Sequence, residues 1–141
     1  MTITIIGGCP GTGKTTLASR LAKNNRRGVH VETDRFFDFT LAYQAAGYEV
    51  FIDGVIGPWW FEQLKAALGD FHYVMLRSDL QTCLDRVATR EDQASATVAV
   101  VRRMHEQFES AATEYSGIIL NTTGRSPDAL LEMLYRDNGL R

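Results

Sequence analysis

The sequence contains little cysteine and no long uninterrupted hydrophobic run. Only 2 of its 141 residues are cysteine, and Cys9 and Cys83 neither share a metal-ligand spacing nor make up a disulfide framework. No apolar run approaches the ~20 residues that a membrane helix needs. The N-terminal residues also lack the basic start and longer apolar run of a signal peptide. These absences argue against a disulfide-stabilised or membrane-spanning protein, and we expect a reduced, cytoplasmic chain.

The sequence has no excess of positive charge. The sequence has 15 Lys and Arg residues and 17 Asp and Glu residues, so its net charge is -2. Proteins that bind duplex nucleic acid neutralise many phosphates with basic residues, so we expect no duplex nucleic-acid partner. The hydrophobic fraction of 45% and the charged fraction of 23% are those of an ordinary globular protein. A length of 141 residues is typical of one domain, and we expect residues 1–141 to form a single domain.

Short apolar segments alternate with helical patterns along the chain. Runs of β-branched and other apolar residues predict strands at 3–6, 29–31, 50–52, 71–76 and 117–120. Apolar periodicity, capping residues and prolines predict helices at about 14–24, 36–46, 58–68, 79–89 and 97–110, and from 127 onward. This alternation is typical of an α/β fold in which helices cover both faces of a parallel sheet. Ligands bind such sheets beyond the carboxyl ends of the strands, so residues that follow the strands are candidates for a site.

The segment after the first predicted strand matches the phosphate-loop pattern G-x-x-x-x-G-K-[ST] in full. It reads Gly8-Cys9-Pro10-Gly11-Thr12-Gly13-Lys14-Thr15. Glycines in such a loop let backbone N–H groups surround phosphate oxygens, and the helix that follows directs its positive end at them. We expect Lys14 to reach the β- and γ-phosphates and the Thr15 hydroxyl to bind Mg²⁺. Together with the adjacent Thr16, the loop predicts a site for Mg-ATP.

Acidic residues follow two other predicted strands. Asp53 ends the strand at 50–52 and is a candidate Mg²⁺ ligand, directly or through water; a plain Asp-Gly turn is the alternative. Asp34 follows the strand at 29–31 and is a candidate general base for an attacking hydroxyl; a helix cap is the alternative. Glu32 is a further candidate for the metal shell.

These features together resemble the small phosphate-loop kinases. That group includes adenylate, shikimate and gluconate kinases, chloramphenicol phosphotransferase and the zeta toxins. The signature of uncharacterised bacterial ATP-binding phosphotransferases is similar to the segments Gly47-Tyr48, Asp53-Gly54, Gly57-Pro58-Trp59, Leu76-Arg77 and His105-Glu106-Gln107-Phe108. The resemblance covers nearly the whole chain. It implies a five-stranded parallel sheet in the order 2-3-1-4-5.

The same resemblance assigns roles to later residues. It implies an adenine-contacting turn at 121–125, with Arg125 in the ATP site. It also implies a lid around 86–103, in which Arg86 and Arg90 stabilise charge on the transferring phosphoryl group and exclude water. A solvated helix face is the alternative explanation for these two arginines.

The chain departs from the nucleoside-monophosphate kinases in its acceptor region. Position 57 is glycine, where those kinases have an arginine that grips the acceptor phosphate. Only the 13 residues 35–47 separate Asp34 from Tyr48, where related kinases have two or more helices. We therefore expect a shortened acceptor segment at 35–47.

Aromatic residues, rather than basic ones, dominate this acceptor region. Arg35 is the only basic residue from position 32 to position 63. The aromatic residues that follow the two acidic strand ends are Phe36, Phe37, Phe39, Trp59, Trp60 and Phe61. An apolar pocket of this kind favours an uncharged or cationic acceptor that bears a hydroxyl.

The sequence therefore predicts an ATP-dependent phosphotransferase that uses Mg²⁺ and acts on the hydroxyl of a small molecule. The short acceptor segment leaves two alternatives open: a nucleotide-binding switch or ATPase, and an ATP-binding module without catalysis. A nucleoside or nucleotide kinase is a further alternative.

Overall fold

One parallel sheet forms the centre of the molecule. The computed structural model describes residues 2–32, 37–89 and 98–137. The sheet has five strands in the order β2-β3-β1-β4-β5, and every neighbouring pair is parallel. The strands are β1 (Ile3–Gly8), β2 (Gly28–Glu32), β3 (Glu49–Gly54), β4 (His72–Arg77) and β5 (Ile118–Asn121). The α/β class and the strand order expected from the resemblance are confirmed.

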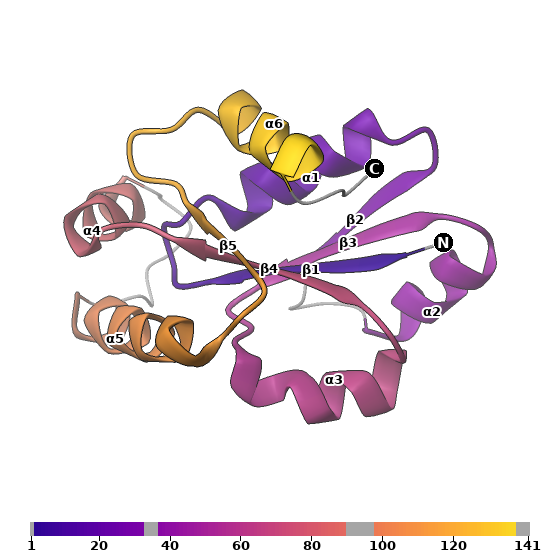
Figure 1. The fold of residues 1–141 in the computed structure, drawn as a ribbon, viewed down its shortest axis with the longest axis horizontal. Helices are drawn as coiled ribbons and strands as arrows, with labels where there is room; N and C mark the ends of the chain where they lie inside the picture. The colour runs from indigo at the N-terminus through magenta and orange to yellow at the C-terminus, as the bar shows by residue number, and fades with distance from the viewer. Residues whose placement is uncertain (1, 33–36, 90–97, 138–141) are drawn as a thin grey trace.

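Helices cover both faces of this sheet (Figure 1). On one face lie α1 (Lys14–Asn24) and α6 (Pro127–Asp137), and on the other lie α3 (Phe61–Leu68) and α5 (Val98–Glu114). The remaining helices are α2 (Phe37–Ala45) and α4 (Leu80–Ala88). Within the described ranges, no helix is both long enough and apolar enough to cross a membrane.

The helix expected from Pro58 onward is divided in two. Pro58–Trp60 form a 3-10 turn, η1, and the α-helix α3 starts at Phe61. The Trp60 N–H donates to the Gly57 carbonyl at 3.0 Å. That i to i+3 bond is characteristic of 3-10 geometry, which is frequent in the first turn of a helix.

Two hydrophobic cores sandwich the sheet, because successive side chains of a strand point to opposite faces. Ile3 and Ile5 of β1 belong to the core beneath α3 and α5. Ile6 belongs to the core beneath α1 and α6, together with Leu17 and Leu134. All six residues of β1 are buried, so the first strand lies at the centre of both cores.

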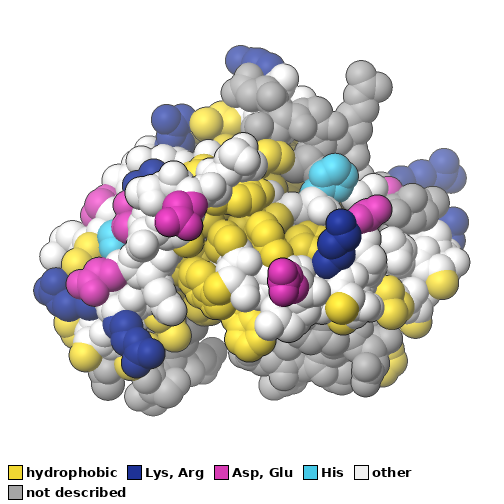
Figure 2. Space-filling model, turned by 60° about the horizontal axis from the view of Figure 1, so that its bottom comes forward, with side chains coloured by type: hydrophobic (Ala, Val, Ile, Leu, Met, Phe, Trp, Pro, Cys, Tyr) yellow, Lys and Arg dark blue, Asp and Glu magenta, His cyan; other side chains and the backbone are white. Residues whose placement is uncertain are grey.

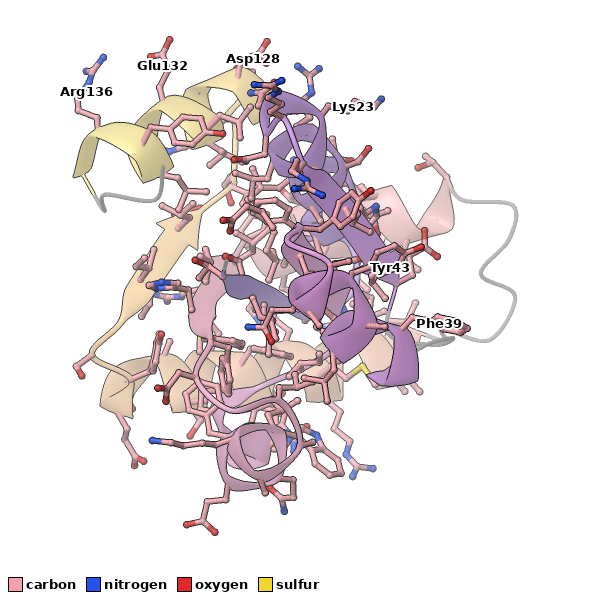
Figure 3. All side chains as sticks on the ribbon, turned by 90° about the vertical axis from the view of Figure 1, so that its right-hand side faces the viewer. Lys23, Phe39, Tyr43, Asp128, Glu132 and Arg136 are labelled. Carbon is pink, nitrogen blue, oxygen red and sulfur yellow. The ribbon has the colours of Figure 1, made fainter. Side chains whose placement is uncertain are left out.

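The last helix shows the amphipathic pattern that this packing requires. Leu130, Leu131 and Leu134 are buried against the sheet. Figure 3 shows Asp128, Glu132 and Arg136 projecting from α6 on its outer side. The apolar stripe therefore fixes which face of α6 contacts the sheet.

The parallel arrangement brings the carboxyl ends of β1, β3 and β4 to one edge of the sheet. In the β1–β3 pair, Ile6 lies opposite Asp53. In the β1–β4 pair, Gly8 lies opposite Leu76. The loop that follows β1 is thus flanked by the end of β3 on one side and the end of β4 on the other.

Replacing Leu134 with alanine should lower the free energy of unfolding by about 2–5 kcal/mol, because it leaves a cavity in the core. Leu134 is 0% exposed, whereas Leu41 of α2 is 45% exposed. Leu41→Ala is a matched control with an expected effect within about 0.5 kcal/mol. Urea denaturation of both variants measures the difference, and equal losses would contradict the packing described for α6.

Candidate phosphate-binding site

The loop between β1 and α1 has the backbone of a phosphate cradle. Gly11 and Gly13 have φ angles of 84° and 90°, in the left-handed region that glycine adopts without strain. Gly13 is the N-cap of α1, and it has no side chain that accepts a hydrogen bond from the first helical N–H groups. The positive end of α1 is therefore directed at the loop, where it favours an anion.

The carbonyl of Cys9 organises the side chains of this loop. Lys14 Nζ donates to the Cys9 oxygen at 2.8 Å, and Thr12 Oγ1 donates to the same oxygen at 2.9 Å. Thr122, just after β5, donates from its hydroxyl to the Thr12 carbonyl at 3.0 Å. Lys14 is consequently held at the mouth of the loop, and the loop is tied to the end of β5.

Asp53 lies directly beside Thr15, as a shared metal site would require. Thr15 Oγ1 donates to Asp53 Oδ2 at 2.7 Å. The other carboxylate oxygen of Asp53 lies 2.6 Å from His30 Nε2. Asp53 is buried, so its carboxylate is held between the first turn of α1 and the imidazole of β2.

These contacts determine the ionisation of Asp53. Burial by itself would raise its pKa, since a carboxylate loses solvation in the interior. The hydrogen bonds from His30 and Thr15, together with the electrostatic effects of His30 and Lys14, lower the pKa and outweigh burial. The pKa of Asp53 therefore lies below its ordinary value, and the group is a carboxylate at neutral pH.

His30 is the site residue that the sequence did not reveal. In the β2–β3 pair, Val31 lies opposite Ile52 and Glu32 opposite Asp53, so His30 reaches Asp53 diagonally on the same face of the sheet. The only signal in the sequence was the alternation of polar His30 and Glu32 on that face, which becomes informative only when β2 is known to pair with β3.

The donor set at Thr15 and Asp53 suits Mg²⁺. This ion prefers oxygen ligands, retains several waters and is commonly held by one or two protein groups together with substrate phosphates. The two side-chain oxygens converge at the end of the loop. Among the described residues, no group of three or more His, Cys, Asp or Glu side chains could hold a metal alone. The two oxygens thus fit an ion that also binds waters and nucleotide phosphates.

A pocket of about 240 Å³ opens beside the loop. Its lining residues come from the loop and α1, from α4, and from the segment between β5 and α6: Thr12, Gly13, Thr16, Leu17, Arg86, Thr89, Thr122, Arg125, Pro127 and Leu130. The structure therefore brings the predicted residues Thr16, Arg86 and Arg125 together. Arg86 also donates from Nη1 to the Gly11 carbonyl at 3.1 Å, which connects α4 to the phosphate loop.

Two other predicted site residues fall outside the described ranges. Asp34, the expected base, and Arg90, the expected lid residue, are not among residues 2–32, 37–89 and 98–137. Their roles stay predictions. Of the lid expected around 86–103, the described parts are the end of α4 and the start of α5.

The side of the site beyond β3 is apolar. The Trp59 ring covers Gly57 so closely that a Cβ at position 57 would lie 2.2 Å from a ring carbon. Trp59 also packs edge-on against Phe108, with ring centroids 5.0 Å apart. Figure 2 shows hydrophobic side chains gathered across the centre of the face that carries α3 and α5. A side chain at position 57 would therefore require the Trp59 ring to move.

Asp53→Asn should change how stability depends on pH. A carboxylate whose pKa is lowered on folding stabilises the protein above its unfolded pKa of about 3.9, and this contribution is lost as the pH falls through the lowered value. The parent should therefore gain stability relative to Asp53→Asn between pH 3 and pH 6, by on the order of 1 kcal/mol. Urea denaturation at several pH values measures this.

The exposed Asp70→Asn variant is the matched control, because the side chain of Asp70 is 98% exposed. A stability difference between the parent and Asp53→Asn that is flat with pH, or that grows towards acid, would contradict the lowered pKa of Asp53.

Residues 3–134 match the family model described as the AAA domain. Solved structures of similar fold include a sugar kinase from Janibacter sp. HTCC2649, with a TM-score of 0.74, 16% identity, and 97% of this chain and 95% of that chain covered. A tunicamycin resistance protein from Deinococcus radiodurans has a TM-score of 0.69 and 20% identity, with 99% and 96% covered. A gluconokinase from Sinorhizobium meliloti 1021 has a TM-score of 0.63 and 14% identity, with 97% of each chain covered.

No curated protein matches the sequence significantly. The similar solved structures share the fold of small phosphate-loop kinases, in agreement with the resemblance found in the sequence. Because the family match extends from residue 3 to residue 134, the chain belongs to the AAA domain family.

Proposed function

We propose that this protein transfers the γ-phosphoryl group of ATP to a hydroxyl of a small molecule. The observation that carries the proposal is the convergence of Lys14, Thr15 and Asp53 at the positive end of α1. A cation, a hydroxyl and a carboxylate in this arrangement suit a nucleotide triphosphate with its metal. The sugar kinase and gluconokinase of similar fold support a phosphotransferase over a simple binding protein.

In the proposed reaction, the acceptor hydroxyl attacks the γ-phosphorus in line with the leaving ADP. The new oxygen–phosphorus bond forms as the bond to the β,γ-bridging oxygen breaks, and Asp34 takes the hydroxyl proton. Lys14, Arg86 and Arg90 stabilise the negative charge that develops on the phosphoryl oxygens. Mg²⁺, held by Thr15 and Asp53, would neutralise charge on the β- and γ-phosphates.

The pocket beside the loop would hold the nucleoside part of ATP. It adjoins Thr12 and Gly13 of the phosphate loop and is lined by Arg86, Arg125 and Pro127. Guanidinium groups stack favourably on aromatic rings, and the apolar side chains of Leu17 and Leu130 provide a complementary wall. The position and lining of this pocket suit a purine base.

The charges near the end of β3 favour an uncharged or cationic acceptor. From position 36 to position 64 the sequence has no lysine or arginine. Arg77, at the end of β4, is engaged by Glu109, with 2.9 Å between Nε and Oε1. A phosphorylated acceptor carries about two negative charges and would find few partners in these segments.

An ATPase that lacks an acceptor is the second candidate function. The short crossover between β2 and β3 favours it, since the described part of that crossover contains only the nine-residue helix α2. Such an enzyme would release ADP at the same rate with and without a hydroxyl acceptor, so the acceptor experiment below separates the two.

Lys14→Ala should weaken Mg-ATP binding by about 10–100-fold, because a charge-assisted hydrogen bond to phosphate contributes about 1.5–3 kcal/mol. Lys23→Ala is a matched control at the other end of the same helix, where the side chain is exposed. Titration calorimetry with Mg-ATP measures both affinities, and thermal unfolding checks that both variants fold. If folded Lys14→Ala bound ATP as tightly as the parent does, the result would contradict the proposed role of this loop in ATP binding.

Nucleoside monophosphates should be poor acceptors, whereas at least one neutral or cationic hydroxyl compound should stimulate ADP release. The assay offers AMP, CMP, GMP and UMP, then nucleosides, sugars, and aminoglycoside- and phenicol-type antibiotics, each with Mg-ATP. Turnover of a monophosphate at about 1 s⁻¹ or faster, the low end of usual enzyme rates, would contradict the proposed acceptor class. ADP release unaffected by every acceptor would favour the ATPase.

A further inference from the structure

The two cysteines of the chain lie side by side, although 74 positions separate them in the sequence. Cys9 belongs to the phosphate loop and Cys83 to α4, and their Sγ atoms are 3.4 Å apart. Both residues are free thiols and both are buried, with exposed fractions of 2% and 0%. The proposed phosphoryl transfer uses neither thiol.

The surroundings of the two thiols shift their pKa values in opposite directions. The hydrogen bond from Cys9 lowers the pKa of Cys83 to about 7, against burial, and nearby positive charge acts in the same direction. The same hydrogen bond and burial raise the pKa of Cys9 well above its ordinary range. Cys83 therefore carries thiolate character near neutral pH, and the thiolate is the reactive form of cysteine.

We propose that Cys9 and Cys83 are a modification site, at which a peroxide forms a reversible disulfide that ties the phosphate loop to α4 and weakens nucleotide binding. The Cys83 thiolate attacks one oxygen of hydrogen peroxide, the O–O bond breaks, and Cys83 becomes a sulfenic acid while hydroxide leaves and takes up the proton that Cys83 had released. Cys9 Sγ then attacks the Cys83 sulfur, the S–O bond breaks, and water leaves with the Cys9 proton. Two thiols and one hydrogen peroxide thus give one disulfide and two waters.

The bond requires movement in a part of the molecule that has little room. A disulfide bond is about 2.05 Å long, so the two sulfur atoms must approach from 3.4 Å. Gly11 already packs against the backbone of Cys83, since a Cβ at Gly11 would lie 2.6 Å from the Cys83 oxygen. Because the loop has little room to move toward α4, we expect bond formation to displace the loop or the helix.

Both movements affect the nucleotide site. The carbonyl of Cys9 holds Lys14 and Thr12, so displacement of Cys9 displaces the cation that faces the phosphates. Arg86 follows Cys83 by one helical turn, donates to Gly11 and lines the pocket, so displacement of α4 changes the pocket wall. Interiors are close-packed and transmit such shifts.

The bond itself is tested by peptide mapping of the full chain. Trypsin cuts after Lys14, Arg77 and Arg86, so oxidation should join the peptides 1–14 and 78–86. The parent is treated with about one equivalent of hydrogen peroxide and mapped by mass spectrometry without reductant. The joined peptide should appear and should vanish after dithiothreitol.

The consequence is tested by calorimetry of ATP on the reduced and oxidised parent. Oxidation should weaken ATP binding about tenfold or more, and dithiothreitol should restore it. Cys83→Ser is the control, since it cannot form the bond and its affinity should not respond to peroxide. Cys83→Ala serves the same purpose if the serine variant does not fold.

Absence of the joined peptide, or unchanged ATP affinity when it forms, would overturn the proposal. An equal response of Cys83→Ser to peroxide would overturn it as well. Failure of the reduced parent to bind ATP would instead contradict the proposed function, and the peptide map would still decide whether the two thiols join.

Discussion

The carboxylate of Asp53 connects the first turn of α1, where the phosphate loop ends, to the end of β3. It receives the Thr15 hydroxyl on one oxygen and faces His30 on the other. This position exists only because β3 lies between β2 and β1, with Asp53 opposite Ile6 and Glu32. The burial of a carboxylate is costly unless it is hydrogen-bonded, and the two partners satisfy both oxygens. The strand order therefore determines the geometry of the candidate metal site.

The phosphate loop is likewise held by hydrogen bonds from several segments of the chain. The Cys9 carbonyl holds Lys14 and Thr12, Thr122 binds the loop from the end of β5, and Arg86 binds it from α4. Each contact comes from a different segment of the chain. A loop with glycines at its turns has little stiffness of its own, and these contacts supply the rigidity that phosphate binding requires. They also explain why a disulfide between Cys9 and Cys83 of α4 would change the shape of the nucleotide pocket.

Local patterns in the sequence predicted the helices, the strands and the phosphate loop. They could not predict contacts between residues that are far apart in the chain. The five strands were predictable because short runs of β-branched and other apolar residues alternate with helical patterns, and the loop because its motif is complete. The strand order came from the family resemblance. The contact of His30 with Asp53, the approach of Cys83 to Cys9 and the cover of Gly57 by Trp59 join segments whose proximity depends on packing. The 3-10 turn at Pro58 was missed because proline suits the start of either kind of helix.

The most direct test of the account measures what Asp53 contributes to metal-dependent nucleotide binding. ATP is titrated into the parent and into Asp53→Asn, once with Mg²⁺ and once with a chelator, and the affinities are read by calorimetry. We expect the parent to bind ATP more tightly with Mg²⁺, and we expect Asp53→Asn to keep the metal-free affinity but to lose most of this gain. An equal gain in the two proteins would show that Asp53 does not bind the metal, and would contradict the metal site inferred at Thr15 and Asp53.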